Sequence, residues 1–208
     1  MKSSNLFEPI VATIATLDIN TVSAERQQVL QPLIDYIKGK QEASAPIHLN
    51  FICTHNSRRS HLSQIWAQTM AAHYGISNVN CYSGGTETTA MFPKVVETLT
   101  KQGFQIQQLS QEDNPVYAIK YEANAPAIIG FSKTYGDDFN PSSAFAAIMT
   151  CSSADEGCPM VFGCEQRIAT TYEDPKVSDG TSQQDEVYLE RSLQIATEMK
   201  FVFESLES

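Results

Sequence analysis

Positive charge is scarce in this sequence, and that scarcity limits the partners that the chain can have. Its 208 residues include 14 Lys and Arg against 24 Asp and Glu, which gives a formal net charge of −10 at pH 7. A protein that wraps nucleic acid neutralises phosphates with basic side chains, so this balance argues against a nucleic-acid partner. A site for an anion must therefore be a local positive pocket in an acidic protein.

Long apolar runs are also scarce, and the sequence lacks the even, regularly spaced cysteines of a disulfide framework. The apolar run at residues 9–17 is far shorter than the roughly 20 residues needed to span a bilayer, so we expect no membrane segment. Glu8 directly before this run, and the lack of a small-residue cleavage site soon after it, argue against a secretion signal. The five cysteines are unequally spaced, as reduced thiols in a cytosolic protein are. We therefore expect a cytoplasmic protein.

The sequence divides into an extension and one main domain. Residues 1–45 contain apolar residues at helical spacing, which predicts a helical extension that packs on the main domain or on another subunit. Residues 46–208 form the predicted main domain. Within it, residues 115–141 contain two β-prone runs around a polar turn, which predicts an inserted β-hairpin.

The main domain alternates strand-like and helix-like segments. The strand-like runs are residues 47–52, 79–82 and 145–150, and the amphipathic helix-like runs are residues 60–74, 93–102 and 186–206. Such alternation predicts right-handed crossovers and a parallel sheet with helices on both faces.

The first strand-like run leads directly into Cys-Thr-His-Asn-Ser-Arg-Arg-Ser, residues 53–60, and then a helix begins. Ligands of an open parallel sheet bind at the carboxyl ends of its strands. A strand–loop–helix turn also directs backbone N–H groups and the positive end of a helix to one point. Both effects favour the thiolate of Cys53 over its thiol and favour a bound anion.

The spacing of side chains in this loop suits a tetrahedral oxyanion. Arg59 lies six positions after Cys53, so it can fold back and bind two oxygens of the anion. Ser60 can donate a hydrogen bond to the sulfur and help it to leave later. Asn56 can brace the loop through hydrogen bonds from its side chain to the backbone.

Residues 53–60 resemble the signature loop of the low-molecular-weight protein tyrosine phosphatases and of the thioredoxin-coupled arsenate reductases with the same fold. The resemblance extends over about residues 47–205 without the insertion, and Tyr-Ser-Gly-Gly-Thr-Glu-Thr at residues 82–88 also fits it. It implies a three-layer α/β sandwich around a central, mainly parallel four-stranded sheet. It also implies oxyanion binding by Cys53, Thr54, His55, Asn56, Ser57, Arg58 and Arg59.

Two further segments match functional parts of the family. Asp174, followed by proline, lies where the family has its general acid. Cys151 and Cys158 follow a strand-like run and resemble the redox pair of the arsenate reductases, which ordinary phosphatases do not need. Lys176 and Val177 stand where tyrosine phosphatases commonly have an aromatic residue, which also favours a reductase.

The resemblance implies a relay of thiol–disulfide steps. Cys53 attacks arsenate, with Asp174 assisting the loss of water, and Cys151 then attacks the Cys53 sulfur so that arsenite leaves. Cys158 next attacks the resulting disulfide, and thioredoxin reduces the Cys151–Cys158 disulfide. The implied partners are a small oxyanion and thioredoxin, an external reductant, with no bound cofactor.

Three positions depart from the family pattern. His55 replaces a glycine, and its backbone is strained if that position has a positive φ. Gln64 replaces a glutamate that helps to hold potassium in some reductases, so we expect no metal. Cys164 is a further cysteine, which we interpret as a passive loop thiol.

Two other functions remain open from sequence. The first is a phosphatase acting on phosphotyrosine or a small phosphoester through Cys53, Arg59 and Asp174, in which Cys151 and Cys158 protect the nucleophile. The second is a non-catalytic module that binds an oxyanion or senses redox state. The sequence does not determine the physiological substrate or the oligomeric state.

Overall fold

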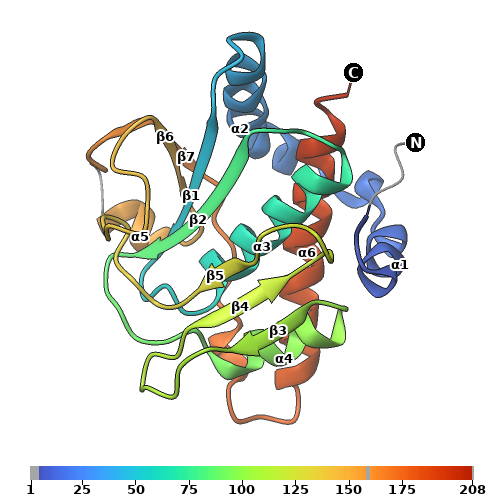
Figure 1. The fold of residues 1–208 in the computed structure, drawn as a ribbon, viewed down its shortest axis with the longest axis vertical. Helices are drawn as coiled ribbons and strands as arrows, with labels where there is room; N and C mark the ends of the chain where they lie inside the picture. The colour runs from blue at the N-terminus through green and yellow to red at the C-terminus, as the bar shows by residue number, and fades with distance from the viewer. Residues whose placement is uncertain (1–4, 158–159, 208) are drawn as a thin grey trace.

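The computed structural model describes residues 5–157 and 160–207, and its centre is a four-stranded parallel sheet (Figure 1). The strands, in spatial order, are β2 (Val79–Gly85), β1 (Ile47–Cys53), β6 (Phe145–Met149) and β7 (Cys164–Ala169). Each neighbouring pair is parallel. The predicted α/β fold around a central parallel sheet is therefore confirmed.

Helices cover both faces of this sheet, and β6 shows how the faces differ. Its residues Ala146 and Ile148 point into the larger core, which is shared with the long helices. The alternate residues Phe145, Ala147 and Met149 point into a smaller core on the other face. The helices of the main domain are α3 (Arg59–His73), α4 (Pro93–Lys101), α5 (Ser152–Gly157) and α6 (Gln184–Glu204). Helices α3 and α6 pack on the face of the larger core, and α5 packs on the face of the smaller one.

The N-terminal extension folds onto the main domain. It consists of α1 (Glu8–Thr16), the short 3₁₀ helix η1 (Ile19–Thr21) and α2 (Ala24–Glu42). The apolar run at residues 9–17 is largely α1, a surface helix that buries Ile10 and Ile14. Helix α2 contacts α6 and β7. Within the described residues, no helix combines the length and apolarity needed to cross a lipid bilayer.

The insertion forms part of a second, antiparallel sheet. Its strands are β3 (Gln105–Gln108), β4 (Tyr117–Lys120) and β5 (Ile128–Gly130). Strands β4 and β5 pair as the predicted hairpin does, whereas β3 was not expected from sequence. The reason is that β3 has the mostly polar, largely exposed sequence Gln-Ile-Gln-Gln, so its strand conformation depends on pairing with β4.

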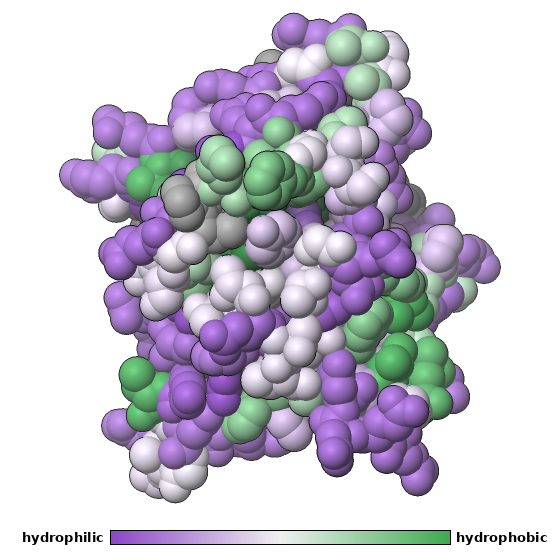
Figure 2. All heavy atoms as spheres, turned by 90° about the vertical axis from the view of Figure 1, so that its left-hand side faces the viewer, coloured by the Kyte–Doolittle hydropathy of each residue, from purple (hydrophilic) through white to green (hydrophobic). Residues whose placement is uncertain are grey.

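Figure 2 shows the molecule from the left-hand side of Figure 1, and this face is mainly hydrophilic. Over the described residues visible there, the hydrophobic side chains form separate small patches rather than one broad face. Scattered patches of this kind are normal for a protein surface.

Candidate oxyanion site

Hydrogen bonds to its carbonyl groups fix the conformation of the loop at residues 53–58. Five successive carbonyls, from residue 53 to residue 57, each accept a bond from outside the loop. The donors are, in order, Thr86 N (3.1 Å), Glu87 N (2.8 Å), Ser132 Oγ (2.9 Å), His61 Nε2 (2.9 Å) and Phe92 N (3.0 Å). Among the described residues, the backbone N–H groups of residues 54–58 donate to no protein acceptor. These N–H groups are therefore available to an anion bound within the loop.

Asn56 fixes the shape of this loop. It is fully buried and has a φ of 44°, a left-handed conformation that Asn tolerates better than most residues. Its Nδ2 donates to Ser60 Oγ at 2.8 Å, and its Oδ1 accepts from Lys133 N at 2.9 Å. Ser60 Oγ in turn lies 3.1 Å from Cys53 Sγ. One side chain thus links the insertion to the nucleophile.

The condition for backbone strain at His55, a positive φ, is not met. Among the described residues other than glycine, the left-handed residue of this loop is Asn56 and not His55. The side chain of His55 therefore extends outward without a steric penalty and is 43% exposed. Its Nε2 lies 3.5 Å from Glu87 Oε2, at the rim of the loop.

Arg59 joins the loop to the predicted general acid. Its Nη2 lies 2.6 Å from Asp174 Oδ2, and its Nη1 donates to the carbonyl of Tyr172 at 2.9 Å. Its buried Nε has no hydrogen-bond partner among the described residues. A buried donor without an acceptor is costly, and an oxyanion in the loop supplies that acceptor.

Arg58 is turned away from the loop interior. Its Nε donates to Tyr188 Oη at 2.6 Å, and its Nη2 lies 2.6 Å from Asp179 Oδ2. The guanidinium also lies over the ring of Phe92, 4.1 Å from its centroid. Two of its three guanidinium nitrogens are therefore engaged by protein groups. Its side chain ties the loop to α6 and to the segment that carries Asp174.

Cys151 lies beside the loop, directly after β6. It is fully buried, in the same small core as Cys53. Its Sγ lies 3.5 Å from Thr54 Oγ1 and accepts a hydrogen bond from Ala154 N at 3.3 Å. Cys158 lies outside the described residues, and Cys164 is half-buried at the start of β7.

His61 supports the loop and was not expected from sequence. It is fully buried between the carbonyl of Asn56 and Ser83 Oγ, which lies 3.3 Å from its Nδ1. The carbonyl can only accept, so Nε2 carries the proton and Nδ1 accepts from the serine. Burial, together with the nearby charge of Lys133, lowers the pKa of His61 to about 3. A neutral His61 therefore fixes the loop at every physiological pH.

Lys133 is a second supporting residue that sequence reasoning missed. It follows β5, is only 2% exposed, and holds Asn56 through its backbone N–H. Its ammonium lies over the rings of Phe131 and Phe139, 4.5 and 5.5 Å from their centroids. Burial lowers the pKa of Lys133 to about 8. No local pattern distinguishes this lysine from a surface one, so the sequence carried no signal for it.

Replacing Lys133 by Met is expected to stabilise the protein at pH 7 by about 2–3 kcal/mol, because the buried ammonium costs free energy in the folded state. The sign follows from proton binding. Between about pH 8 and the ordinary lysine value near 10.4, the unfolded chain holds a proton that the folded protein lacks, so stability rises with pH.

Lys133→Met removes that rise, which chemical denaturation at pH 7, 9 and 10.5 measures. The variant keeps the backbone hydrogen bond from residue 133 to Asn56. Lys38→Met on α2, which removes the same charge elsewhere, is the control. A Lys133→Met variant that is less stable at pH 7, with the same pH slope as the wild type, contradicts the prediction.

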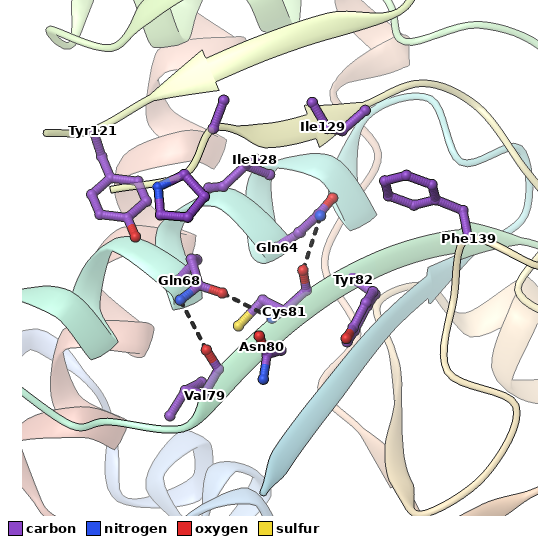
Figure 3. Close-up of a pocket in the computed structure, with 12 residues that line it drawn as sticks. Gln64, Gln68, Val79, Asn80, Cys81, Tyr82, Tyr121, Ile128, Ile129 and Phe139 are labelled. Atoms are coloured by element: carbon purple, nitrogen blue, oxygen red, sulfur yellow. Dashed lines mark hydrogen bonds between the residues drawn. The ribbon is translucent and has the colours of Figure 1, made fainter. Parts of the chain in front are cut away.

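Two cavities lie near these elements, and they differ in their relation to the loop. A recess of about 300 Å³ adjoins the loop itself and is bounded by His55, Arg58, Phe92 and Lys176. A second cavity, of about 330 Å³, lies between β2 and the hairpin (Figure 3). The residues that line the second cavity include none from residues 53–60. This cavity is therefore separate from the candidate oxyanion loop.

Gln64, which stands where some reductases have a glutamate that helps to hold potassium, has a structural role. Gln64 Nε2 donates to the carbonyl of Cys81 in β2 at 3.0 Å (Figure 3). Over the part of the chain that the structure describes, no group of three or more His, Cys, Asp or Glu side chains is arranged to hold a metal ion.

Known proteins share this sequence pattern and fold. Residues 48–121 match the family model for low-molecular-weight phosphotyrosine protein phosphatases. No curated protein matches the sequence. A low-molecular-weight protein tyrosine phosphatase from Bacillus subtilis superposes with a TM-score of 0.52 at 15% identity, covering 77% of this chain and 97% of that chain. A phosphatase of the same class from Vibrio cholerae gives 0.51 at 13% identity, covering 78% and 97%.

A thioredoxin-dependent arsenate reductase from Corynebacterium glutamicum covers 98% of this chain and 84% of its own, at 20% identity. Its TM-score of 0.41 is too low to bear on function. The phosphatase superpositions, at their low identities, establish the fold and not the substrate. Residues 48–121, which include the loop of residues 53–60, are therefore similar to the low-molecular-weight phosphotyrosine phosphatases, and the chain shares the α/β fold of these solved structures.

Proposed function

We propose that this protein reduces arsenate to arsenite with Cys53 as nucleophile and Cys151 as the second thiol. The observation that carries the proposal is the position of Cys151. Its sulfur lies 3.5 Å from Thr54 Oγ1, at the edge of the candidate anion loop. A phosphatase needs no second thiol at this position, whereas a reductase needs one that reaches the nucleophile.

The first step forms a covalent adduct. The Cys53 thiolate attacks arsenic, a sulfur–arsenic bond forms, and one arsenate oxygen leaves as water after it is protonated. Asp174 supplies that proton, since it lies 2.6 Å from Arg59, which binds the anion. The free N–H groups of residues 54–58 and Arg59 Nε hold the remaining oxygens.

The second step transfers electrons to arsenic. The Cys151 thiolate attacks the Cys53 sulfur, a sulfur–sulfur bond forms, and the electron pair of the sulfur–arsenic bond passes to arsenic. Arsenic is reduced by two electrons and leaves as arsenite. Cys158 then attacks Cys151, frees Cys53 as a thiolate, and leaves a Cys151–Cys158 disulfide that thioredoxin reduces.

Arsenate-dependent oxidation of NADPH, coupled through thioredoxin and its reductase, tests this proposal. We expect turnover by the wild type and by Cys164→Ser, a control that removes a half-buried thiol outside the relay. Cys53→Ser and Cys151→Ser are expected to be inactive. Hydrolysis of para-nitrophenyl phosphate is expected to persist in Cys151→Ser, because ester hydrolysis needs only the loop and the acid.

The proposal fails if the wild type shows no arsenate turnover, or if Cys151→Ser retains it. Robust hydrolysis of phosphate esters by a wild type that does not reduce arsenate supports the other candidate, a phosphatase. One observation favours that candidate. The recess of about 300 Å³ beside the loop has room for a leaving group larger than the single oxygen that arsenate loses.

A further inference from the structure

The segment that carries Asp174 is anchored at both of its ends. Residues 170–179 form most of the connection between β7 and α6 and include the 3₁₀ helix η2 (Pro175–Ser178). At its far end, Asp179 pairs with Arg58 of the loop at 2.6 Å. Its near end is held by Arg26, which belongs to the N-terminal extension and not to the main domain.

Arg26 makes three contacts from the first turn of α2. Its Nη2 donates to the carbonyl of Thr170 at 2.9 Å and lies 2.7 Å from Glu198 Oε2 of α6. Its guanidinium carbon lies 4.8 Å from the ring centroid of Tyr172. Thr170 and Tyr172 are buried and the side chain of Arg26 is 21% exposed, so these contacts are partly buried.

Tyr172 connects Arg26 to the candidate site through its own backbone contacts. Its carbonyl accepts from Arg59 Nη1 at 2.9 Å, and Arg59 Nη2 lies 2.6 Å from Asp174. Its backbone N–H donates to Thr150 O at 3.1 Å, next to Cys151. A continuous set of contacts therefore runs from Arg26 through Tyr172 and Arg59 to the carboxylate of Asp174.

We propose that Arg26 is a positioning residue, through which the N-terminal extension holds Asp174 in place for proton transfer. The inference rests on the proposed role of Asp174 as general acid. A displacement of about 1 Å in such a group is enough to cost a large factor in rate. The N-terminal extension therefore contributes to the geometry of the site as well as to the packing of the main domain.

The variant has to remove the anchor without unfolding the protein. Arg26→Met alone leaves Glu198, which is 3% exposed, as a buried unpaired carboxylate. The double variant Arg26→Met/Glu198→Gln removes both charges together. The matched control is Lys40→Met/Glu165→Gln, which removes the ion pair between the other end of α2 and β7, 2.6 Å long and remote from Asp174.

Leaving-group dependence separates a positioning role from a merely structural one. A poor leaving group such as phenolate needs a proton from the acid, whereas dinitrophenolate does not. We expect the Arg26→Met/Glu198→Gln variant to hydrolyse phenyl phosphate about tenfold more slowly, with 2,4-dinitrophenyl phosphate and the melting temperature little changed. The Lys40→Met/Glu165→Gln control is expected to match the wild type with both esters.

Amide hydrogen exchange supplies a readout that does not depend on turnover. Exchange in residues 170–179 is expected to quicken in the Arg26 variant and not in the control. Unchanged exchange in this segment, or an equal loss of rate with both esters, overturns the inference. Asp174→Asn, assayed in parallel, separates a failure of the positioning role of Arg26 from a failure of the acid role of Asp174. If Asp174→Asn loses rate equally with phenyl phosphate and 2,4-dinitrophenyl phosphate, the acid role of Asp174 fails instead.

Discussion

Asp174→Asn is expected to lower the hydrolysis of phenyl phosphate by about 10²–10⁴-fold, which is the usual contribution of a positioned general acid. The asparagine keeps the size of the side chain and its hydrogen bond to the backbone N–H of Lys176, which Asp174 Oδ1 accepts at 3.0 Å. It cannot supply a proton to the leaving oxygen. With 2,4-dinitrophenyl phosphate, which needs no proton, we expect a much smaller loss.

The same variant is expected to bind inorganic phosphate more tightly than the wild type. The Asp174 carboxylate lies 2.6 Å from Arg59 Nη2, so it competes with an anion for that donor and repels it. Inhibition of ester hydrolysis by phosphate measures the change. Asp179→Asn, which weakens the pair with Arg58, is the comparison. Equal losses with both esters for Asp174→Asn contradict the assignment of the acid.

Gly85→Ala is expected to abolish most activity, by about 100-fold or more, because it displaces the loop that holds the anion. Gly85 ends β2 directly behind that loop. A Cβ at this position lies 2.6 Å from the carbonyl oxygen of Thr54 and 2.7 Å from the backbone nitrogen of Asn56. These neighbours are backbone atoms, so they can move only if the loop moves.

We also expect Gly85→Ala to lose about 2–3 kcal/mol of stability, as overpacked sites do. Thermal unfolding and ester hydrolysis measure the two effects. Gly136→Ala in the nearby insertion is the matched control, because a Cβ at Gly136 has no atom within 4 Å. A Gly85→Ala variant with wild-type turnover would show that the loop tolerates a shift of its backbone.

The nucleophile loop was predictable from sequence because its signals are local. An apolar strand, a Cys and an Arg six positions later, and an amphipathic helix all lie within one short stretch. Strand, loop and helix follow from hydrophobic periodicity, and the anion site follows from the free N–H groups that such a turn presents. The parallel sheet followed in the same way, from the alternation of strand-like and helix-like runs.

Two strands, β7 and β3, were not predicted from the sequence because their residues are largely polar or half-exposed. Strand β6 is buried along its whole length and is a continuous apolar run in the sequence. Strand β7 is half-exposed at the edge of the sheet and contains charged residues. Strand β3, which is polar, gave no signal either. Such segments become strands because a neighbouring strand offers hydrogen bonds, and the sequence of one segment does not report its neighbour.

The amino-acid sequence by itself thus determined the α/β fold and the candidate oxyanion loop around Cys53 and Arg59. The tertiary structure alone decided which residue of that loop is left-handed, which arginine turns outward, and how the insertion and the extension reach the site. Asn56 bonds to Lys133 77 positions away, and Arg59 bonds to Asp174 115 positions away. Contacts over such separations depend on the packing of the whole chain, so no local pattern encodes them.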